Sequence, residues 1–432
     1  MVMRSRPLRR GDIARAATVV IVALVLSVLE PTAVGAVPGC EPIRPETCSL
    51  RQLADLAGIR IGSTAEASEV VDPDYAVPLA REFTALTPEN ALKWYTTQPS
   101  AGAWNFSDAD AVVGFARSNG MTVRGHTLVW AQNTYTPGWV RDLSDPAALE
   151  VAVEEQITTT MEHFGADIER WDVVNEPLAS LGTGRSDSVF WTLGPDWIAD
   201  AFILADRIDP DAELWLNEYG SDWIPGKHEA LLDLVRNLVD AGVPIDGVGL
   251  QTHRLPGAVL DQERFASQLR DFTTLGLQVA ITELDVPIAP TDPNGFDAQA
   301  AEYGRIVRAC LSIPGCVEIT VWGLSDASTW LDSLGLFPTP TRPLLFDDSF
   351  GPKPAYDAVR QALADKVAPP PIPVTVQPDA DPTDPTDPTT LLPVTGSATA
   401  PLAALALVLV IGGLILNRTA RRPSPRIHQS PQ

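Results

Sequence analysis

Short apolar runs alternate with longer amphipathic stretches throughout the segment 49–366. The apolar runs are rich in Val, Ile and Leu and lack polar alternation, which is typical of parallel strands covered on both faces. The strands are predicted at residues 59–61, 83–86, 122–124, 170–174, 213–216, 247–250, 279–281 and 318–321.

Helical periodicity fills the stretches between the predicted strands. Apolar residues recur every three or four positions from Leu149 to Phe164, with Ser144 as the expected N-cap and Gly165 as the stop. Eight strand–helix repeats in a segment of this length predict an α/β fold, a single (β/α)₈ TIM barrel domain over residues 49–366.

The beginning of the chain has the pattern of an export signal. Several arginines within residues 1–10 precede an apolar run over residues 16–29, and small residues close the segment at Ala36. This order predicts a signal peptide over residues 1–36, removed after Ala36. A short N-terminal segment, residues 37–48, then leads into the barrel. An uncleaved membrane anchor is the alternative.

The end of the chain combines a linker with an apolar tail. Proline, aspartate and threonine dominate residues 367–391, which predicts a disordered, extended linker of about 3 Å per residue. Residues 392–432 follow, with Leu-Pro-Val-Thr-Gly at 392–396, an apolar run at 398–416 and basic residues after it. The run is long enough for a transmembrane helix, which needs roughly 20 apolar residues.

This order of motif, apolar run and basic tail resembles the LPXTG-type cell-wall sorting signal of Gram-positive bacteria. The resemblance implies that a sortase cuts between Thr395 and Gly396 and joins Thr395 to peptidoglycan. We therefore expect a secreted protein anchored to the Gram-positive cell wall. A membrane-anchored extracellular protein is the alternative, because basic residues after the apolar run would stay cytoplasmic.

Charge and cysteine content narrow the possible partners. The formal net charge of −24 argues against a nucleic acid, whose phosphates would repel the chain, and leaves a neutral polysaccharide as a suitable partner. The cysteines form two close pairs, Cys40/Cys48 and Cys310/Cys316, which suggests two disulfides in an exported protein. No Cys-x-x-Cys or His-rich cluster occurs, so we expect no structural metal. We also expect no cofactor and a monomeric protein.

Polar and aromatic residues follow seven successive predicted strands. In a TIM barrel the carboxyl ends of all strands converge on one face, where the active site is built. A purely structural role would favour apolar or small residues at these ends. We therefore expect a single site that contains Glu89, Asn90, Lys93, His126, Trp130, Asn175, Glu176, Asn217, Glu218, Gln251, His253, Glu283 and Trp322.

Two carboxylates in this set suit glycoside hydrolysis. The reaction needs one carboxyl group to protonate the leaving oxygen and a second to attack or stabilise the anomeric carbon. Glu176 and Glu283 follow the fourth and seventh strands, which lie nearly opposite in a barrel of eight. Glu89, Glu218 and Asp285 compete for these two roles.

The residues around both glutamates resemble glycoside hydrolase family 10. Trp-Asp-Val-Val-Asn-Glu-Pro at 171–177 and Ile-Thr-Glu-Leu-Asp at 281–285 look like the acid/base and nucleophile motifs of the family, and the segments 87–94, 124–130 and 320–326 add support. Characterised members are mostly endo-1,4-β-xylanases that retain anomeric configuration. The resemblance implies retaining cleavage of xylan or xylo-oligosaccharides, with Glu176 as general acid/base and Glu283 as nucleophile.

The resemblance also implies roles for the surrounding residues. Asn175 is expected to contact the sugar 2-hydroxyl, His253 to orient Glu283, and Gln251 to lie near the acid/base. The remaining expected substrate contacts are Glu89, Asn90, Lys93, His126, Trp130, Asn133, Tyr219, Trp322 and Trp330.

The residues after Trp130 depart from the family pattern. Ala131 and Asn133 stand where an imidazole and a longer amide are usual, and that amide helps to exclude sugars with a hydroxymethyl arm. Discrimination by such contacts changes by only about 1–3 kcal/mol. A β-1,4-glucanase or cellobiosidase is therefore one alternative to a xylanase. A wall-displayed carbohydrate-binding protein without catalysis is the other.

Overall fold

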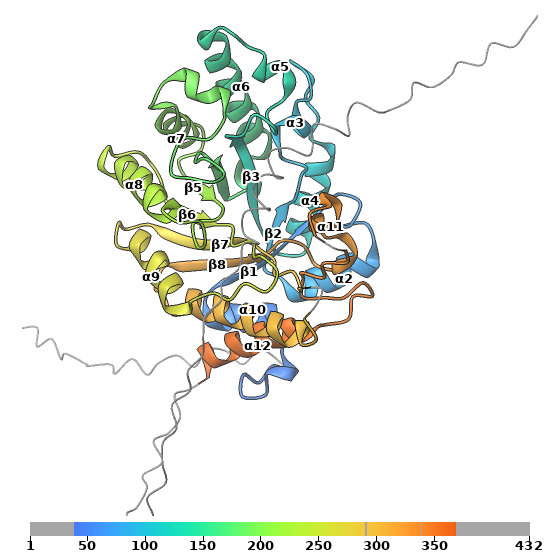
Figure 1. Ribbon diagram of the computed structural model, residues 1–432. Helices are drawn as coiled ribbons and strands as arrows, with labels where there is room; N and C mark the ends of the chain where they lie inside the picture. Colours follow the sequence, from blue (N-terminus) through green and yellow to red (C-terminus); the bar gives the residue numbers. More distant parts are fainter. Residues whose placement is uncertain (1–38, 290–291, 338, 369–432) are drawn as a thin grey trace, which may run out of the picture. The chain divides into compact units, whose positions relative to one another are not determined.

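The computed structural model describes residues 39–289, 292–337 and 339–368, the coloured part of Figure 1. Within these residues the strands form a closed parallel barrel in sequence order, with β1 also paired to β8. The strands are β1 (Arg60–Ala65), β2 (Ala85–Pro88), β3 (Thr122–Trp130), β4 (Arg170–Asn175), β5 (Glu213–Glu218), β6 (Gly247–Leu250), β7 (Gln278–Leu284) and β8 (Cys316–Val321). The predicted (β/α)₈ barrel is confirmed.

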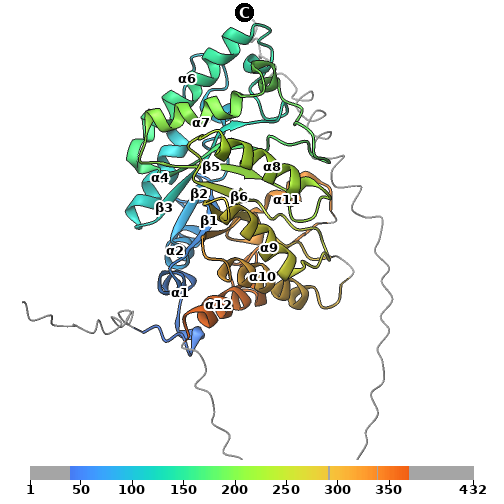
Figure 2. The ribbon, with the colours of Figure 1, turned by 90° about the vertical axis from the view of Figure 1, so that its left-hand side faces the viewer.

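Helices surround the barrel and connect successive strands (Figure 1). The α-helices are α1 (Leu50–Ala57), α2 (Pro73–Glu82), α3 (Trp94–Thr97), α4 (Ser107–Ser118), α5 (Gly138–Arg141), α6 (Pro146–Phe164), α7 (Trp197–Ile208), α8 (Lys227–Asp240), α9 (Gln262–Thr273), α10 (Gly295–Leu311), α11 (Trp330–Leu334) and α12 (Pro354–Val367). Short 3₁₀ turns are η1 (Pro45–Thr47), η2 (Gly165–Asp167), η3 (Val189–Leu193) and η4 (Asp326–Ser328). Neighbouring helices pack in pairs, such as α6 with α7 (Figure 2) and α10 with α12.

The strands differ from their predicted bounds mainly by being longer. β3 extends to Trp130, β5 to Glu218 and β7 to Leu284, so several expected site residues lie within strands rather than after them. Polar residues at these strand ends interrupt the apolar runs, which is why the runs alone end too early. The second strand is also displaced: it was predicted at residues 83–86, but β2 begins at Ala85, after Phe83 and Thr84.

The N-cap of α6 is Asp145, not Ser144 as expected. The Asp145 side chain accepts the Ala147 N–H at 3.1 Å, and Pro146 occupies the first helical position, which needs no N–H partner. The expected stop is correct, since Gly165 is the C-cap with φ of 48°.

Both suggested disulfides are present. Cys40–Cys48 closes the segment that carries η1, and Cys310–Cys316 joins the end of α10 to the start of β8. The expected signal peptide, linker and sorting signal lie outside the described residues. Among the described residues, no helix is both long enough and apolar enough to span a membrane.

Two glycines of β6 make room for large side chains inside the barrel. A Cβ on Gly247 would lie 2.6 Å from the Trp215 ring, and a Cβ on Gly249 would lie 2.3 Å from the Asn217 side chain. Since real Cβ atoms do not approach this closely, glycine is required for both side chains to point inward. Asn217 belongs to the site described below.

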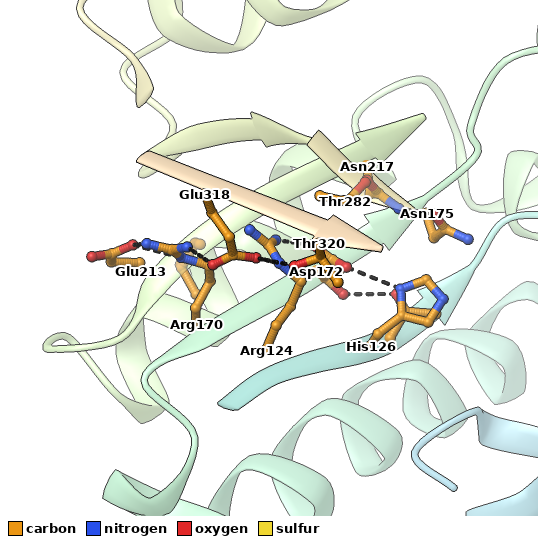
Figure 3. A network of polar contacts seen from close by, with 12 residues as sticks. Arg124, His126, Arg170, Asp172, Asn175, Glu213, Asn217, Thr282, Glu318 and Thr320 are labelled. Atoms are coloured by element: carbon orange, nitrogen blue, oxygen red, sulfur yellow. Dashed lines mark hydrogen bonds and ion pairs between the residues drawn. The ribbon is translucent and has the colours of Figure 1, made fainter. Parts of the chain in front are cut away.

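A buried ionic network fills the barrel near the amino ends of its strands (Figure 3). Glu318 of β8 accepts from Arg124 of β3 at 2.9 Å and from Arg170 of β4. Arg124 also donates to Asp172 at 2.7 Å, and both guanidinium groups lie over the Trp215 ring. Burial alone would raise the pKa of Glu318, but the two arginines lower it to about 2.

We expect Glu318→Gln to destabilise the fold by roughly 3–5 kcal/mol, because it leaves two buried guanidinium groups without their shared carboxylate. The folded-state pKa of Glu318 lies below the ordinary 4.5, so its contribution is complete above that pH and lost as the pH falls toward 2. The part of the pH dependence of the unfolding free energy that comes from Glu318 should disappear in Glu318→Gln.

Urea unfolding near neutral pH and at about pH 3 measures both effects. Asp167→Asn is the control: it breaks an exposed pair with Arg117 and should cost less than about 1 kcal/mol. Equal losses in the two variants would contradict a stabilising role for the buried network.

Candidate active site

The carboxyl ends of the strands surround a cleft of about 320 Å³. Every substrate-contact residue expected from the sequence lines it except Asn133. Those residues are Glu89, Asn90, Lys93, His126, Trp130, Asn175, Glu176, Tyr219, Gln251, His253, Glu283, Trp322 and Trp330. The topology therefore brings both proposed carboxylates into one cavity.

Glu283 of β7 lies in an environment that favours its ionised form. Its two oxygens accept from Asn217 Nδ2 at 2.7 Å and from His253 Nε2 at 3.1 Å. Burial alone would raise the pKa of Glu283, but the hydrogen bond from His253 and nearby charges, including Lys93, hold it below the ordinary 4.5. Such a carboxylate is available as a nucleophile.

His253 is fixed between two carboxylates. Its Nδ1 lies 2.8 Å from Asp285 Oδ2, an oxygen that also accepts from Trp330 Nε1 at 2.8 Å. Burial would lower the pKa of His253, but Asp285 and Glu283 raise it to about 10. At neutral pH the ring is therefore an imidazolium that donates to both carboxylates. Asp285 thus orients His253 and does not line the cleft itself.

Glu176 lies immediately after β4 in a left-handed backbone conformation, with φ of 57°. Its N–H donates to Asn217 O at 2.9 Å, and its Oε1 accepts from Gln251 Nε2 at 2.9 Å. Burial raises the pKa of Glu176, and the charge of Glu283 adds to the increase, while the hydrogen bond from Gln251 opposes it. The two glutamates therefore have pKa values shifted in opposite directions.

Two asparagines link the glutamates. Asn217 Nδ2 donates to Asn175 Oδ1 at 2.9 Å as well as to Glu283, and Asn175 Nδ2 lies 3.4 Å from Glu176 Oε1. Thr282 Oγ1 fixes Asn217 from the other side at 2.7 Å. Asn217 follows the fifth predicted strand, but its contact with Glu283 was not predicted from the sequence.

Charged residues after β2 form one end of the cleft. Lys93 Nζ donates to Asn90 Oδ1 at 2.8 Å and lies 4.8 Å from the centre of the Trp130 ring. Burial raises the pKa of Glu89 to about 7, although Lys93 opposes the shift. Glu66, which the sequence did not single out, accepts from Asn90 Nδ2.

His126 and the aromatic side chains complete the walls. His126 Nδ1 lies 2.9 Å from Asp172 Oδ2, which joins the site to the ionic network (Figure 3). Trp322 packs edge-on to His126, with ring centres 5.3 Å apart, and Trp330 lies 4.9 Å from His253. These rings could cover the apolar faces of a sugar.

Asn133 does not line the cleft. Its side chain accepts the Val189 N–H at 2.8 Å and donates to Asp187 at 3.2 Å, so it anchors the β4–α7 loop. Tyr135, two residues later, lines the cleft instead and stacks on Trp130 at 3.7 Å between ring centres.

Further cleft residues, which were not predicted from the sequence, lie in loops and in the short helices α3 and α11. Strand-end positions gave no signal for these side chains. The additional lining residues are Tyr95, Tyr135, Gly220, Trp223, Arg254, Leu331, Ser333, Leu334 and Phe337. The described residues contain no cluster of His, Cys, Asp and Glu that could hold a metal ion.

Two carboxyl groups with opposite pKa shifts in one cleft are the arrangement that glycoside hydrolysis requires. Residues 49–362 match the model of glycosyl hydrolase family 10. The chain belongs to this family.

Named relatives agree with this assignment. Endo-1,4-beta-xylanase B of Thermotoga neapolitana is 37% identical over 325 residues, covering 74% of this chain and 92% of that protein. Endo-1,4-beta-xylanase A of Phanerodontia chrysosporium is 36% identical over 72% of this chain and 76% of that protein. The crystal structure of native xylanase 10B from Thermotoga maritima has a TM-score of 0.69 and 35% identity, covering 74% of this chain and 99% of that one.

We expect Gln251→Leu to move the alkaline limb of the kcat/KM profile to higher pH. A general acid must be protonated to act, and Gln251 stabilises the ionised form of Glu176, so loss of that hydrogen bond should raise the pKa of Glu176 further. The acid limb, which reports on Glu283, should stay in place.

The measurement is kcat/KM on a xylo-oligosaccharide as a function of pH. Gln156→Leu serves as the control, because Gln156 is equally buried but donates to the Leu128 carbonyl. A downward shift of the alkaline limb in Gln251→Leu would contradict the assignment.

Proposed function

We propose that this protein is an endo-1,4-β-xylanase that cuts internal bonds of xylan with retention of anomeric configuration. Family membership and the names of the relatives support the reaction and the substrate class. The observation that carries the mechanism is the opposite shift in the pKa values of Glu176 and Glu283 within one cleft.

In the first step, Glu283 attacks the anomeric carbon while Glu176 protonates the departing glycosidic oxygen. A covalent glycosyl-enzyme forms, and the aglycone leaves with the proton. In the second step, Glu176 removes a proton from water, which attacks the same carbon and releases Glu283. Each carboxyl group therefore returns to its starting state.

The coupling between the two glutamates supports this division of roles. The ionised Glu283 helps to keep Glu176 protonated before the first step. Glycosylation removes the charge of Glu283, which should lower the pKa of Glu176 and prepare it to act as a base. The hydrogen bonds from Asn217 and His253 meanwhile orient Glu283 for attack.

Other cleft residues would supply the contacts with the sugars. Asn175 and His126 are placed to contact the reacting sugar, and Glu89, Asn90 and Lys93 the next sugar on the non-reducing side. Trp322 and Trp330 would cover these sugars, and Tyr219 would stack on the leaving-group side. Asn133 was also expected to contact the substrate, but its amide is engaged in the β4–α7 loop, so we assign it no such contact.

A β-1,4-glucanase remains the second candidate. Since Asn133 faces a loop, its amide does not help to exclude a hydroxymethyl arm from the cleft. The crystal structure of one relative, xylanase 10B from Thermotoga petrophila, contains xylobiose. This complex favours xylan as the substrate of this chain. Sugar release from xylan and from carboxymethylcellulose separates the candidates, and faster release from the cellulose would overturn the substrate assignment.

We expect Glu283→Gln to abolish sugar release from xylan, because no nucleophile remains. Glu176→Gln should also lose activity on xylan but still form the glycosyl-enzyme from aryl glycosides with good leaving groups, which need no acid. Azide should partly restore its turnover by attacking that intermediate. The assay compares reducing-sugar release from xylan with phenolate release from dinitrophenyl β-xylobioside.

Asp285→Asn is a useful third variant, because it leaves both glutamates in place and weakens the contacts of Asp285 with His253 and Trp330. Full activity of Glu283→Gln on both substrates would contradict the nucleophile assignment. Wild-type protein that bound xylan but released no sugar would favour the binding-protein alternative.

We further propose that the enzyme is exported and attached to the cell wall of a Gram-positive bacterium by a sortase acting at Thr395. The signal-peptide pattern and the ordered Leu-Pro-Val-Thr-Gly motif, apolar run and basic tail support this location. The linker over residues 367–391 would hold the barrel away from the wall.

When the full chain is expressed in a sortase-containing Gram-positive host, we expect the processed protein in the cell-wall fraction, from which muramidase releases it. Thr395→Ala should leave it in the membrane fraction, because the sortase does not recognise the altered motif, whereas Thr390→Ala in the linker should change nothing. Wall attachment of the Thr395→Ala protein would rule out the sortase proposal.

A further inference from the structure

A buried ion pair lies behind the leaving-group side of the cleft. Glu218, the last residue of β5, and Lys227, the first residue of α8, are both fully buried. Lys227 Nζ lies 2.9 Å from Glu218 Oε1 and 3.4 Å from the centre of the Tyr219 ring. Neither Glu218 nor Lys227 lines the cleft.

If Lys227 served only to stabilise the fold, its burial at the start of a helix would be an unfavourable arrangement. Burying an ammonium group carries a desolvation penalty that an ion pair often fails to offset. The amino end of a helix also disfavours a cation, because the helix dipole is positive there. Burial raises the pKa of Glu218 to about 7 even with Lys227 beside it. A hydrophobic pair of similar volume would fill the same space at lower cost.

The Glu218 carboxylate connects two loops that carry cleft residues. Its Oε2 accepts the N–H of Leu178 at 3.0 Å, and its Oε1 accepts the N–H of Tyr219 at 3.0 Å. Leu178 follows Glu176 by two residues, with only Pro177 between them. Because proline fixes φ, the position of Leu178 restricts the backbone of Glu176.

Glu176 needs such support because its backbone is left-handed, with φ of 57°. That conformation is uncommon for residues other than glycine and persists only where the surroundings enforce it. Two hydrogen bonds hold this turn against β5, from Glu176 N–H to Asn217 O at 2.9 Å and from Leu178 N–H to Glu218.

We infer that Glu218 and Lys227 position the general acid Glu176 and the Tyr219 ring for departure of the leaving group. These two residues and the N–H groups of Leu178 and Tyr219 form the acid clamp. Glu218 and Lys227 are positioning residues that touch no substrate. The inference rests on the proposed function and adds a second group of residues that controls protonation of the leaving oxygen.

The test compares two substrates with different needs for an acid. Cleavage of xylotetraose needs protonation of the leaving oxygen, whereas dinitrophenyl β-xylobioside has a good leaving group and does not. Glu218→Leu with Lys227→Met replaces the pair by apolar side chains and leaves no buried charge, so the barrel should still fold. We expect kcat/KM for xylotetraose to fall at least tenfold more than kcat/KM for the aryl substrate.

Glu218→Gln keeps one oxygen acceptor for the two N–H groups. It should therefore lower the ratio of kcat/KM for xylotetraose to kcat/KM for the aryl substrate by only about threefold. The control is Glu82→Leu with Arg81→Met, which removes a buried carboxylate that also accepts a backbone N–H, from Leu50 at 2.9 Å. That pair lies in α2, away from the cleft, and the ratio should not change. Thermal unfolding verifies that each variant is folded.

Equal losses on both substrates, or an unchanged ratio in either folded Glu218 variant, would overturn the acid clamp. If the double variant does not fold, Glu218→Gln decides the question. Failure of the wild-type enzyme to cleave xylotetraose would instead overturn the proposed function, so the two failures are distinguishable.

Discussion

The proposed mechanism depends on two carboxyl groups in one cleft whose pKa values are shifted in opposite directions. Two glutamates that share one cleft would each make the other harder to ionise. Here imidazolium and amide donors stabilise the charge of Glu283, while burial favours the neutral form of Glu176. The asparagine pair Asn175 and Asn217 links the two groups and fixes their relative position.

The barrel supplies this arrangement from its strands. Each glutamate is held by residues from neighbouring strand ends, so the positions of the strands determine the geometry of the site. The ionic network around Glu318 joins β3, β4 and β8, and its member Asp172 also contacts His126 in the cleft. Stability at the amino end of the barrel and substrate contacts at the carboxyl end are therefore physically connected.

The fold and most of the site could be predicted from the sequence because both follow from the repeated alternation of apolar strand segments and amphipathic helices. Once eight parallel strands are assigned, residues at their carboxyl ends must meet, and Glu176, Gln251 and Glu283 line one cleft. Both disulfides were suggested by the close spacing of the cysteines.

Loop residues could not be placed in this way. The path of the chain after Trp130 depends on hydrogen bonds to the β4–α7 loop, which turn Asn133 away from the cleft and bring Tyr135 into it. Lys227 gave no signal either, because a lysine at the start of a helix is ordinarily exposed. Its burial depends on Glu218, a contact between two elements that periodicity does not reveal.

The most direct test of the mechanism is the anomeric configuration of the sugar first released from a xylo-oligosaccharide. Proton NMR during the first minutes of hydrolysis distinguishes the two anomers before mutarotation mixes them. Attack by Glu283 followed by attack of water predicts the β-anomer as the initial product. Initial appearance of the α-anomer would mean a single displacement by water and would contradict a covalent role for Glu283.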